Sequence, residues 1–362
     1  MKKIDYILLI AVILLSLFGL LMIYSSSNIW AEYKFSDPYK FLKTQGIFLL
    51  ISYIIIYYMQ RVPYITYLKK TNLIFGICFI LLILVLIPGI GTVRNGSRSW
   101  FGIGGFGIQP SEFMKLAIII FTSKYLSKNE KLIKDVKKGV FPILLILFIT
   151  FGLILLQPDF GTGVIMVMTI IVLLFISGVD MSFFIKIGCL GLLGISGLII
   201  IAPYRIKRIL SFLNPWSDPL GSGFQIIQSL YSIGPGGLLG LGFGNSIQKH
   251  FYLPEPQTDF IFSIISEEFG FMGIIIVATL FLIIIYRGFR ISKKCENHFG
   301  KYLAFGITFG IAFQTLLNLM VVVGLIPVTG VTLPFLSYGG SSLLITMLSI
   351  SILLNISKYN YE

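Results

Sequence analysis

The sequence predicts an all-α integral membrane protein with ten transmembrane helices. Hydrophobic residues make up 56% of its 362 residues and charged residues only 12%, a balance that a water-soluble domain of this size does not have. A helix needs about 20 apolar residues to cross the hydrocarbon of a membrane. Such stretches recur along one polytopic domain, residues 1–362, with expected bounds 5–24, 43–60, 72–87, 111–127, 139–156, 160–178, 182–201, 257–286, 300–322 and 333–356.

The alternative membrane architecture, a closed β-barrel, is excluded by the hydrophobic pattern. Barrel strands of about ten residues alternate apolar and polar side chains, whereas residues 141–156 are apolar on every face. Lysine and arginine gather in alternate loops, at residues 61–70, 124–138 and 287–301, and near both ends. Because positive residues mark the cytoplasmic side, we expect a multi-pass membrane protein with both termini in the cytoplasm.

Net charge and the rarer residues exclude several classes of function. The charge of +13 at pH 7 comes from scattered residues, which indicates topology and attraction to membrane lipids and predicts no binding of nucleic acid. Cys78, Cys189 and Cys295 fall in apolar helices or a cytoplasmic loop, so no disulfide is expected. His250 and His298 are expected on opposite sides of the membrane, which makes a zinc site or a catalytic triad hard to assemble. Acid–base chemistry therefore falls to carboxylates.

The first informative outer loop is residues 88–110, which is too rich in glycine to form a helix. It places Arg94 and Arg98 on the outer side, where basic residues are otherwise rare, and Arg98 lies two positions from Trp100. An aromatic ring beside a guanidinium suits a sugar and a phosphate. The alternative is an interfacial tryptophan with arginine paired to lipid phosphate.

Two further outer segments carry charge close to the apolar spans. Gln109 to Glu112 is a helix-start pattern, and Lys115 follows within the span, where an unpaired ammonium costs several kcal/mol. We expect Glu112 or Asp159 to pair with it, because Asp159 lies in the outer connection between two spans. These three residues are candidates for a substrate cavity, with an ion-pair network that only fixes helix packing as the alternative.

The large outer loop, residues 202–256, is longer than a connection requires and indicates a binding surface. Arg205, Arg208 and Lys249 are basic residues on the side that is otherwise poor in them, and with Glu255 they are candidates for substrate binding.

Within this loop we expect a short amphipathic helix over 225–233 and a glycine-rich run over 234–244, whose backbone amides are suited to a ligand. No Walker lysine accompanies the glycines, so ATP binding is not supported.

Asp259 opens the eighth span at its outer end. The default expectation is that Thr258 or Asp259 caps this helix. Glu267 and Glu268 follow near the outer boundary as intramembrane polar residues, and a kink at Gly270 would place them deeper, as a buried pair with a cation or as a proton site. These alternatives stay open at the level of local sequence.

Three blocks resemble a known family. They are NGSRSWFGIGGFGIQPSEFMK at 95–115, GLGFGNSIQKHFYLPEPQTDFIFSIISEEFG at 240–270 and PVTGVTLPFLSYGGSSLL at 327–344, and they resemble the SEDS family of FtsW, RodA and SpoVE proteins. The resemblance extends almost end to end, and the last two blocks look more like FtsW or SpoVE than RodA. The implied fold has ten spans and a large extracytoplasmic loop between the seventh and the eighth.

The resemblance implies a peptidoglycan glycosyltransferase. Family members polymerise lipid II, the undecaprenyl-pyrophosphate-linked disaccharide pentapeptide, beside a class B penicillin-binding protein, in cell division, sporulation or cell-shape maintenance. Asp259 matches the family's catalytic aspartate. Trp100, Glu112, Lys115 and Asp159 match other functionally sensitive positions. Two basic residues commonly precede the tryptophan, but here the pair is Arg98-Ser99, so one positive charge is missing.

The implied reaction needs a base near a sugar hydroxyl and cations near a pyrophosphate. Asp259 fits the first role, and Arg98, Arg205 or Arg208 fit the second. No cofactor is assigned from the sequence, and a role for a divalent cation, Mg²⁺ or Mn²⁺, stays open. Two rival functions remain: a lipid II flippase or transporter, favoured by intramembrane polar residues, and a non-catalytic scaffold for a transpeptidase.

Overall fold

The structure, a computed structural model, describes residues 4–94, 96–102, 107–133, 135–201, 206, 212–221 and 223–359. Its helices are α1 (Tyr6–Phe35), α2 (Lys40–Met59), α3 (Ile65–Leu84), α4 (Pro110–Lys128), α5 (Phe141–Leu155), α6 (Phe160–Ile176), α7 (Met181–Ile201), α9 (Phe224–Ile233), α10 (Ile261–Lys294), α11 (His298–Val322) and α12 (Gly340–Lys358). A π-turn, η1 (Val136–Val140), a 3-10 turn, η2 (Pro215–Ser217), and the strands β1 (Thr92–Arg94) and β2 (Ser97–Trp100) complete the described elements.

The helical class predicted from hydropathy is confirmed, and each expected span contains a helix. In the described chain, seven helices are long and apolar enough to cross a membrane. α4 is not among them because it carries Glu112, Lys115 and two further lysines, and α6 has only 17 residues. The expected bounds differ by seven or more residues at four ends. α1 continues past 24 to Phe35, α3 begins at Ile65 rather than 72, α10 ends at Lys294 rather than 286, and α12 begins at Gly340 rather than 333.

Local hydrogen bonds explain the differences at α1 and α12. The hydroxyls of Ser26 and Ser27 donate to the carbonyl of Ile23 within α1, so these polar residues fit inside a helix. Before α12, the Ser337 hydroxyl accepts from the Leu333 amide, and Phe335 has a positive φ of 65°. The chain there is therefore an irregular connection.

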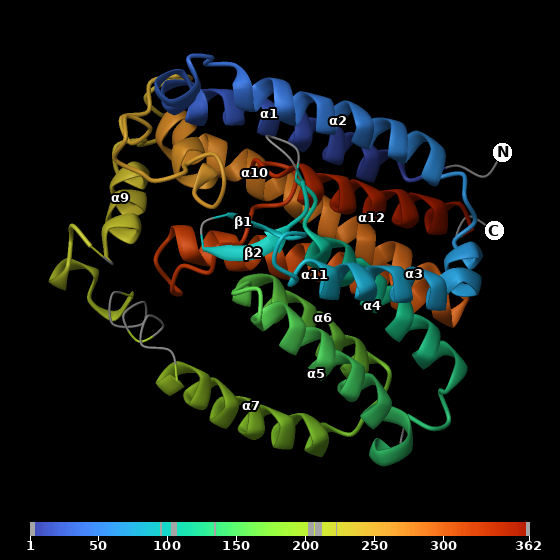
Figure 1. Cartoon of the computed structure of the whole chain (residues 1–362). Coiled ribbons are helices and arrows are strands. Elements are labelled where there is room, and N and C mark those ends of the chain that lie inside the picture. The colour runs from blue at the N-terminus through green and yellow to red at the C-terminus, as the bar shows by residue number, and fades with distance from the viewer. Residues whose placement is uncertain are drawn as a thin grey trace.

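The helices form one bundle with α10, α11 and α12 at its centre (Figure 1). α10 packs between α1 and α11, α12 packs against α2, and α4 contacts α3, α6 and α11. In α12, 78% of the most apolar window is buried, against 22% in α3, so α12 is interior and α3 faces the surroundings of the bundle. α7 runs along the outside, beyond α5 and α6 (Figure 1).

The bundle has two chemically different ends. Both termini lie at one end (Figure 1), where Arg287 pairs with Asp5 at 2.6 Å; we call it the terminal end. The β1–β2 hairpin, α9 and the long connection before α10 lie at the opposite end, the loop end. The helix predicted at 225–233 is confirmed as α9, whereas the antiparallel hairpin, with Arg94 opposite Ser97, was not predicted.

Candidate active site

The hairpin brings an arginine and the tryptophan of the first outer loop together. Arg94 lies over the Trp100 ring, with its guanidinium carbon 5.1 Å from the ring centre. From the sequence, Arg98 rather than Arg94 was expected to lie beside Trp100. The Arg98 Nε–H is buried and has no hydrogen-bond partner among the described residues. The hydroxyl of Ser97 donates to the Gln157 carbonyl, which joins the hairpin to the α5–α6 connection.

Either Glu112 or Asp159 was expected to pair with Lys115, and the structure shows that Glu112 does. The Lys115 ammonium lies 3.0 Å from a Glu112 carboxylate oxygen and donates to the Gln314 side chain of α11 at 2.9 Å. The two charged side chains are 12% and 7% exposed. They line a cavity of about 50 Å³, whose walls are otherwise mainly apolar and come from α4, α6, α11 and α12. The ion pair therefore borders open space instead of being fully enclosed by protein.

Asp159 joins the same region from the α5–α6 connection. Its carboxylate caps α6 by accepting from the Thr162 amide at 3.3 Å. It also accepts from Gln109 at 2.8 Å and Ser111 at 3.0 Å at the start of α4. Burial raises the pKa of the Asp159 carboxyl, and the hydrogen bond from Thr162 partly opposes that shift. The predicted gathering of Glu112, Lys115 and Asp159 is therefore confirmed, with Asp159 held by neutral donors.

Asp259 lies just before α10, and the N-cap position expected for Thr258 or Asp259 is held by Phe260, whose side chain makes no cap bond. Asn318 of α11 donates to the Asp259 carbonyl at 2.8 Å. A Cβ on Gly330 would lie 3.8 Å from an Asp259 carboxylate oxygen. Asp259 is thus positioned by α11 and by the connection that precedes α12.

The same connection joins Asp259 to the other candidate residues. A Cβ on Gly161, at the start of α6, would meet the carbonyl of Thr329 at 2.8 Å, so residues 329–331 lie between the Asp159 turn and Asp259. The Tyr338 amide, at the end of this connection, donates to the Gln257 carbonyl at 2.8 Å. We call the resulting group the outer site: Arg94, Arg98, Trp100, Glu112, Lys115, Asp159 and Asp259.

Sequence reasoning missed Gln314, Asn318 and Gly330, which position the outer site. Gln314 holds Lys115 and also donates to the Thr332 carbonyl at 2.9 Å, and Asn318 holds both Asp259 and Val331. The available signal was two amide side chains four residues apart in an otherwise apolar span, which places them on one helix face.

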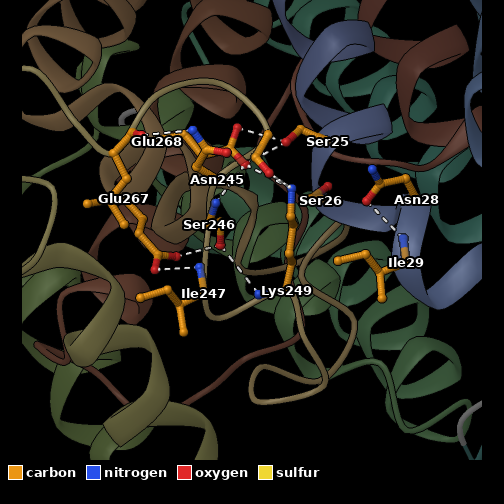
Figure 2. Close-up of polar contacts among 12 residues, drawn as sticks. Ser25, Ser26, Asn28, Ile29, Asn245, Ser246, Ile247, Lys249, Glu267 and Glu268 are labelled. Atoms are coloured by element: carbon orange, nitrogen blue, oxygen red, sulfur yellow. Dashed lines mark hydrogen bonds and ion pairs between the residues drawn. The ribbon is translucent and has the colours of Figure 1, made fainter.

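Lys249, Glu267 and Glu268 form a separate, closed cluster (Figure 2). The Lys249 ammonium donates to the Gly244 carbonyl at 2.5 Å and lies 3.5 Å from Glu268, and the Lys249 and Glu268 side chains are 2% and 0% exposed. The assignment of Lys249 to substrate is corrected for this reason, since its charge is enclosed by protein. The kink suggested for Gly270 is present, with φ 59° and ψ −154°.

The remaining candidates contribute less to the geometry. Glu255 is exposed in the turn before Asp259, with a positive φ of 46°. Arg205 and Arg208 lie outside the described residues. In the described part of the chain, no three His, Cys, Asp or Glu side chains converge as metal ligands would.

Comparison with known proteins gives matches along the whole chain. The family model described as cell cycle protein, for FtsW, RodA and SpoVE, matches residues 5–362. Stage V sporulation protein E of Bacillus subtilis (strain 168) is 54% identical over 98% of this chain and 97% of its own length. A probable peptidoglycan glycosyltransferase FtsW of Geobacter sp. (strain M18) is 41% identical over 98% of this chain and 96% of its own length.

Solved structures agree. A chain of a peptidoglycan synthase complex superposes with a TM-score of 0.82 at 30% identity, over 99% of both chains. The crystal structure of Thermus thermophilus rod shape determining protein RodA gives 0.73 at 27% identity, over 99% of this chain and 98% of that one. The identities confirm that the sequence is more similar to SpoVE and FtsW than to RodA. The chain is a multi-pass membrane protein and belongs to the FtsW/RodA/SpoVE family of cell cycle proteins.

Proposed function

We propose that this protein is a peptidoglycan glycosyltransferase that polymerises lipid II into β-1,4-linked glycan strands at the outer face of the cytoplasmic membrane. In this proposal the chain crosses the membrane ten times, the terminal end faces the cytoplasm and the loop end faces outward, beside a class B penicillin-binding protein. Relatives along the full length carry the name peptidoglycan glycosyltransferase. The observation that carries the proposal is that the connection before α12 joins Asp259, through residues 329–332, to the Asp159 turn and to Gln314, which holds Lys115.

Two contacts between α1 and α10 support this placement in the membrane. Asp5 pairs with Arg287 at the terminal end, and Ser25 donates to Glu268 toward the loop end. The two contacts are separated by about 30 Å along α1, at 1.5 Å per residue, which matches the hydrocarbon thickness of a bilayer. Asp259 precedes Glu268 by nine residues, so it lies about 13 Å farther toward the loop end, level with lipid headgroups.

The chemistry follows from this placement. Asp259 accepts the proton of the 4-hydroxyl on the acceptor's terminal sugar as that oxygen attacks the anomeric carbon of the donor. The new C1–O4 bond forms, the bond from C1 to the pyrophosphate oxygen breaks, and the lipid pyrophosphate leaves with the electron pair. Attack opposite an α-linked leaving group gives the β linkage. Arg98 and Lys115 offset the charge that develops on the pyrophosphate, and no step is assigned to a divalent cation.

Polymerisation by purified protein tests the proposal. Wild type, Asp259→Asn and Asp37→Asn are incubated with lipid II, with and without the cognate transpeptidase, and glycan chains are followed on a gel. Asp37 is the matched control because it is an aspartate on the α1–α2 connection, paired with Lys43 at 2.9 Å, and belongs to no part of the outer site. We expect glycan from wild type and Asp37→Asn, and none from Asp259→Asn.

The other outcomes assign the rival functions. Glycan from Asp259→Asn at the wild-type rate removes the base role from Asp259. If no folded variant makes glycan even with its partner present, the polymerase function is rejected. Lipid II transport and transpeptidase scaffolding then remain, and a lipid II translocation assay in vesicles distinguishes them.

A further inference from the structure

The glycine-rich segment 234–244 pairs with the broken backbone of α10. Gly270 interrupts the helix, so the carbonyls of Glu267 and Glu268 accept from the amides of Leu241 and Gly242 at 2.9 and 3.0 Å. In return, the amides of Phe271 and Met272 donate to the carbonyls of Gly237 and Leu238 at 2.9 and 3.1 Å. The segment thus replaces hydrogen bonds that the kink removes from α10.

Glycine is required where the two backbones meet. A Cβ on Gly236 would lie 2.1 Å from the Ser266 carbonyl, one on Gly240 would lie 2.1 Å from the Glu268 carbonyl, and one on Gly270 would lie 2.5 Å from the Gly240 nitrogen. These distances exclude a side chain. The glycine run is therefore explained by a close approach of two backbone segments, and the ligand suggested from the sequence is not needed to account for it.

Side chains of α10 fix the next part of the loop (Figure 2). Glu267 accepts from the Ser246 hydroxyl and the Ile247 amide at 2.5 and 2.9 Å. Glu268 accepts from the Ser25 hydroxyl of α1 at 2.6 Å and pairs with Lys249. Both carboxylates are at most 1% exposed. The loop is consequently attached to α10 by backbone bonds on one side and by buried carboxylates on the other.

The depth of the segment follows from its partners on α10. Glu268 marks the outer edge of the hydrocarbon in the placement proposed above, and Phe271 and Met272 lie on its membrane side. Leu238 and Leu239, at the tip of the segment, are 72% and 79% exposed. Residues 234–248 contain no charged side chain. Irregular backbone at this depth requires protein to satisfy its polar groups, as it does here for the amides of 240–242 and the carbonyls of 236–238.

We propose that residues 236–242 form a re-entrant turn whose tip, Leu238–Leu239, is inserted among the acyl chains of the outer leaflet. The tip continues the lipid-facing surface of α10, where Phe271, Met272 and Ile276 are 53%, 48% and 55% exposed. This continuity commits the exposed tip to lipid as its occupant. The turn ties the Asp259-bearing loop to the membrane surface, and the inference rests on the membrane placement in the proposed function.

Spin labels measure the insertion directly. Cys78, Cys189 and Cys295 are replaced by alanine, and a nitroxide is attached to Leu238→Cys or Leu239→Cys in nanodiscs of phosphatidylethanolamine and phosphatidylglycerol. Oxygen partitions into hydrocarbon, and a nickel chelate stays in water. The controls are Leu282→Cys, exposed near the middle of α10, and Tyr33→Cys, exposed at the loop end of α1. Two tip positions are used so that one poorly folded variant does not decide the result.

We expect the ratio of oxygen to nickel accessibility at both tip positions to match Leu282→Cys and to exceed Tyr33→Cys several-fold. A ratio like that of Tyr33→Cys would place the turn in water, and protection from both reagents would place it under protein; either overturns the inference. The readout needs no turnover, so failure of polymerisation and failure of insertion are separate results.

Discussion

The outer site and the Glu268 cluster are built from the same residue types and behave differently. Lys115 pairs with Glu112 at 3.0 Å beside a cavity and keeps 12% of its side chain exposed. Lys249 pairs with Glu268 at 3.5 Å, with 2% and 0% exposed. In the first pair a donor is available to an incoming group, whereas in the second the protein occupies the donors and acceptors. The two ion pairs carry the same charges, so the feature that distinguishes the Lys115 pair is the open space beside it.

The largest loss of stability is expected when Lys249, the enclosed lysine, is removed. Lys249→Met leaves Glu268 buried without its cation, which should lower the free energy of unfolding by about 3–5 kcal/mol. Chemical unfolding in detergent measures it. The matched variant Lys115→Met should cost less stability, because its pair borders a cavity, yet lower polymerisation about 100-fold by removing one charge-stabilising group. Equal destabilisation by both variants would break the distinction between the clusters.

The second test concerns the backbone that carries the Glu268 cluster. Gly270→Ala forces a side chain into φ 59°, ψ −154° and against the Gly240 nitrogen, so we expect a loss of about 1–3 kcal/mol from backbone strain alone. Gly152→Ala, in α5 with no atom within 4 Å of the added carbon, should stabilise by about 0.5–1 kcal/mol. Thermal unfolding of the two variants in the same detergent measures the difference. The same sign for both would show that the α10 kink is not fixed by the loop.

A loss of similar size is expected on removing the contact that attaches α1 to this cluster. Ser25→Ala removes a hydroxyl that donates to a buried carboxylate at 2.6 Å, which should cost about 1.5–3 kcal/mol. Ser27→Ala is the control, because the Ser27 hydroxyl donates to the Ile23 carbonyl within its own helix. Unfolding by denaturant should separate them. A neutral Ser25→Ala would mean that Lys249 and the loop amides satisfy Glu268 without α1.

Some of the features that these tests address could be predicted from the sequence, and others could not. Hydropathy predicted the spans because burial in lipid is a property of a whole segment, and the Glu112–Lys115 pair followed from a spacing of three residues on a helix. The kink at Gly270 could be anticipated. Its partner segment could not, because pairing between residues 237–242 and 267–272 depends on two backbones far apart in the chain.

The candidate site shows the same limit. Asp259 was identified through its sequence block, but its supports, Asn318 and Gly330, come from α11 and the connection before α12. The hairpin was also missed, since the two strands are only three and four residues long and their sequence is neither apolar nor strongly alternating. Lys249 was misassigned because net charge on an outer loop does not reveal that a buried carboxylate already holds it.

The smallest effect is a pH dependence that distinguishes two aspartates at the loop end. Burial raises the pKa of Asp159 above its ordinary value of 3.8, so the folded state holds that proton more tightly than the unfolded state. Its contribution to stability is therefore full below pH 3.8 and is lost as pH rises through the folded pKa. Asp37 is the opposite case, because its hydrogen bond with Lys43 lowers its pKa, so its contribution is present above 3.8 and lost as pH falls.

Melting temperatures measured from acid to neutral pH test this difference in sign. Compared with wild type, Asp159→Asn should become relatively more stable toward neutral pH. The variant lacks a carboxyl group that must lose its proton inside the protein, where burial disfavours the charged form. Asp37→Asn should differ from wild type only at neutral pH, and weakly, because an exposed ion pair is screened by solvent. Parallel pH profiles for wild type and Asp159→Asn would show that the hydrogen bonds from Thr162, Gln109 and Ser111 outweigh the burial of the Asp159 carboxylate.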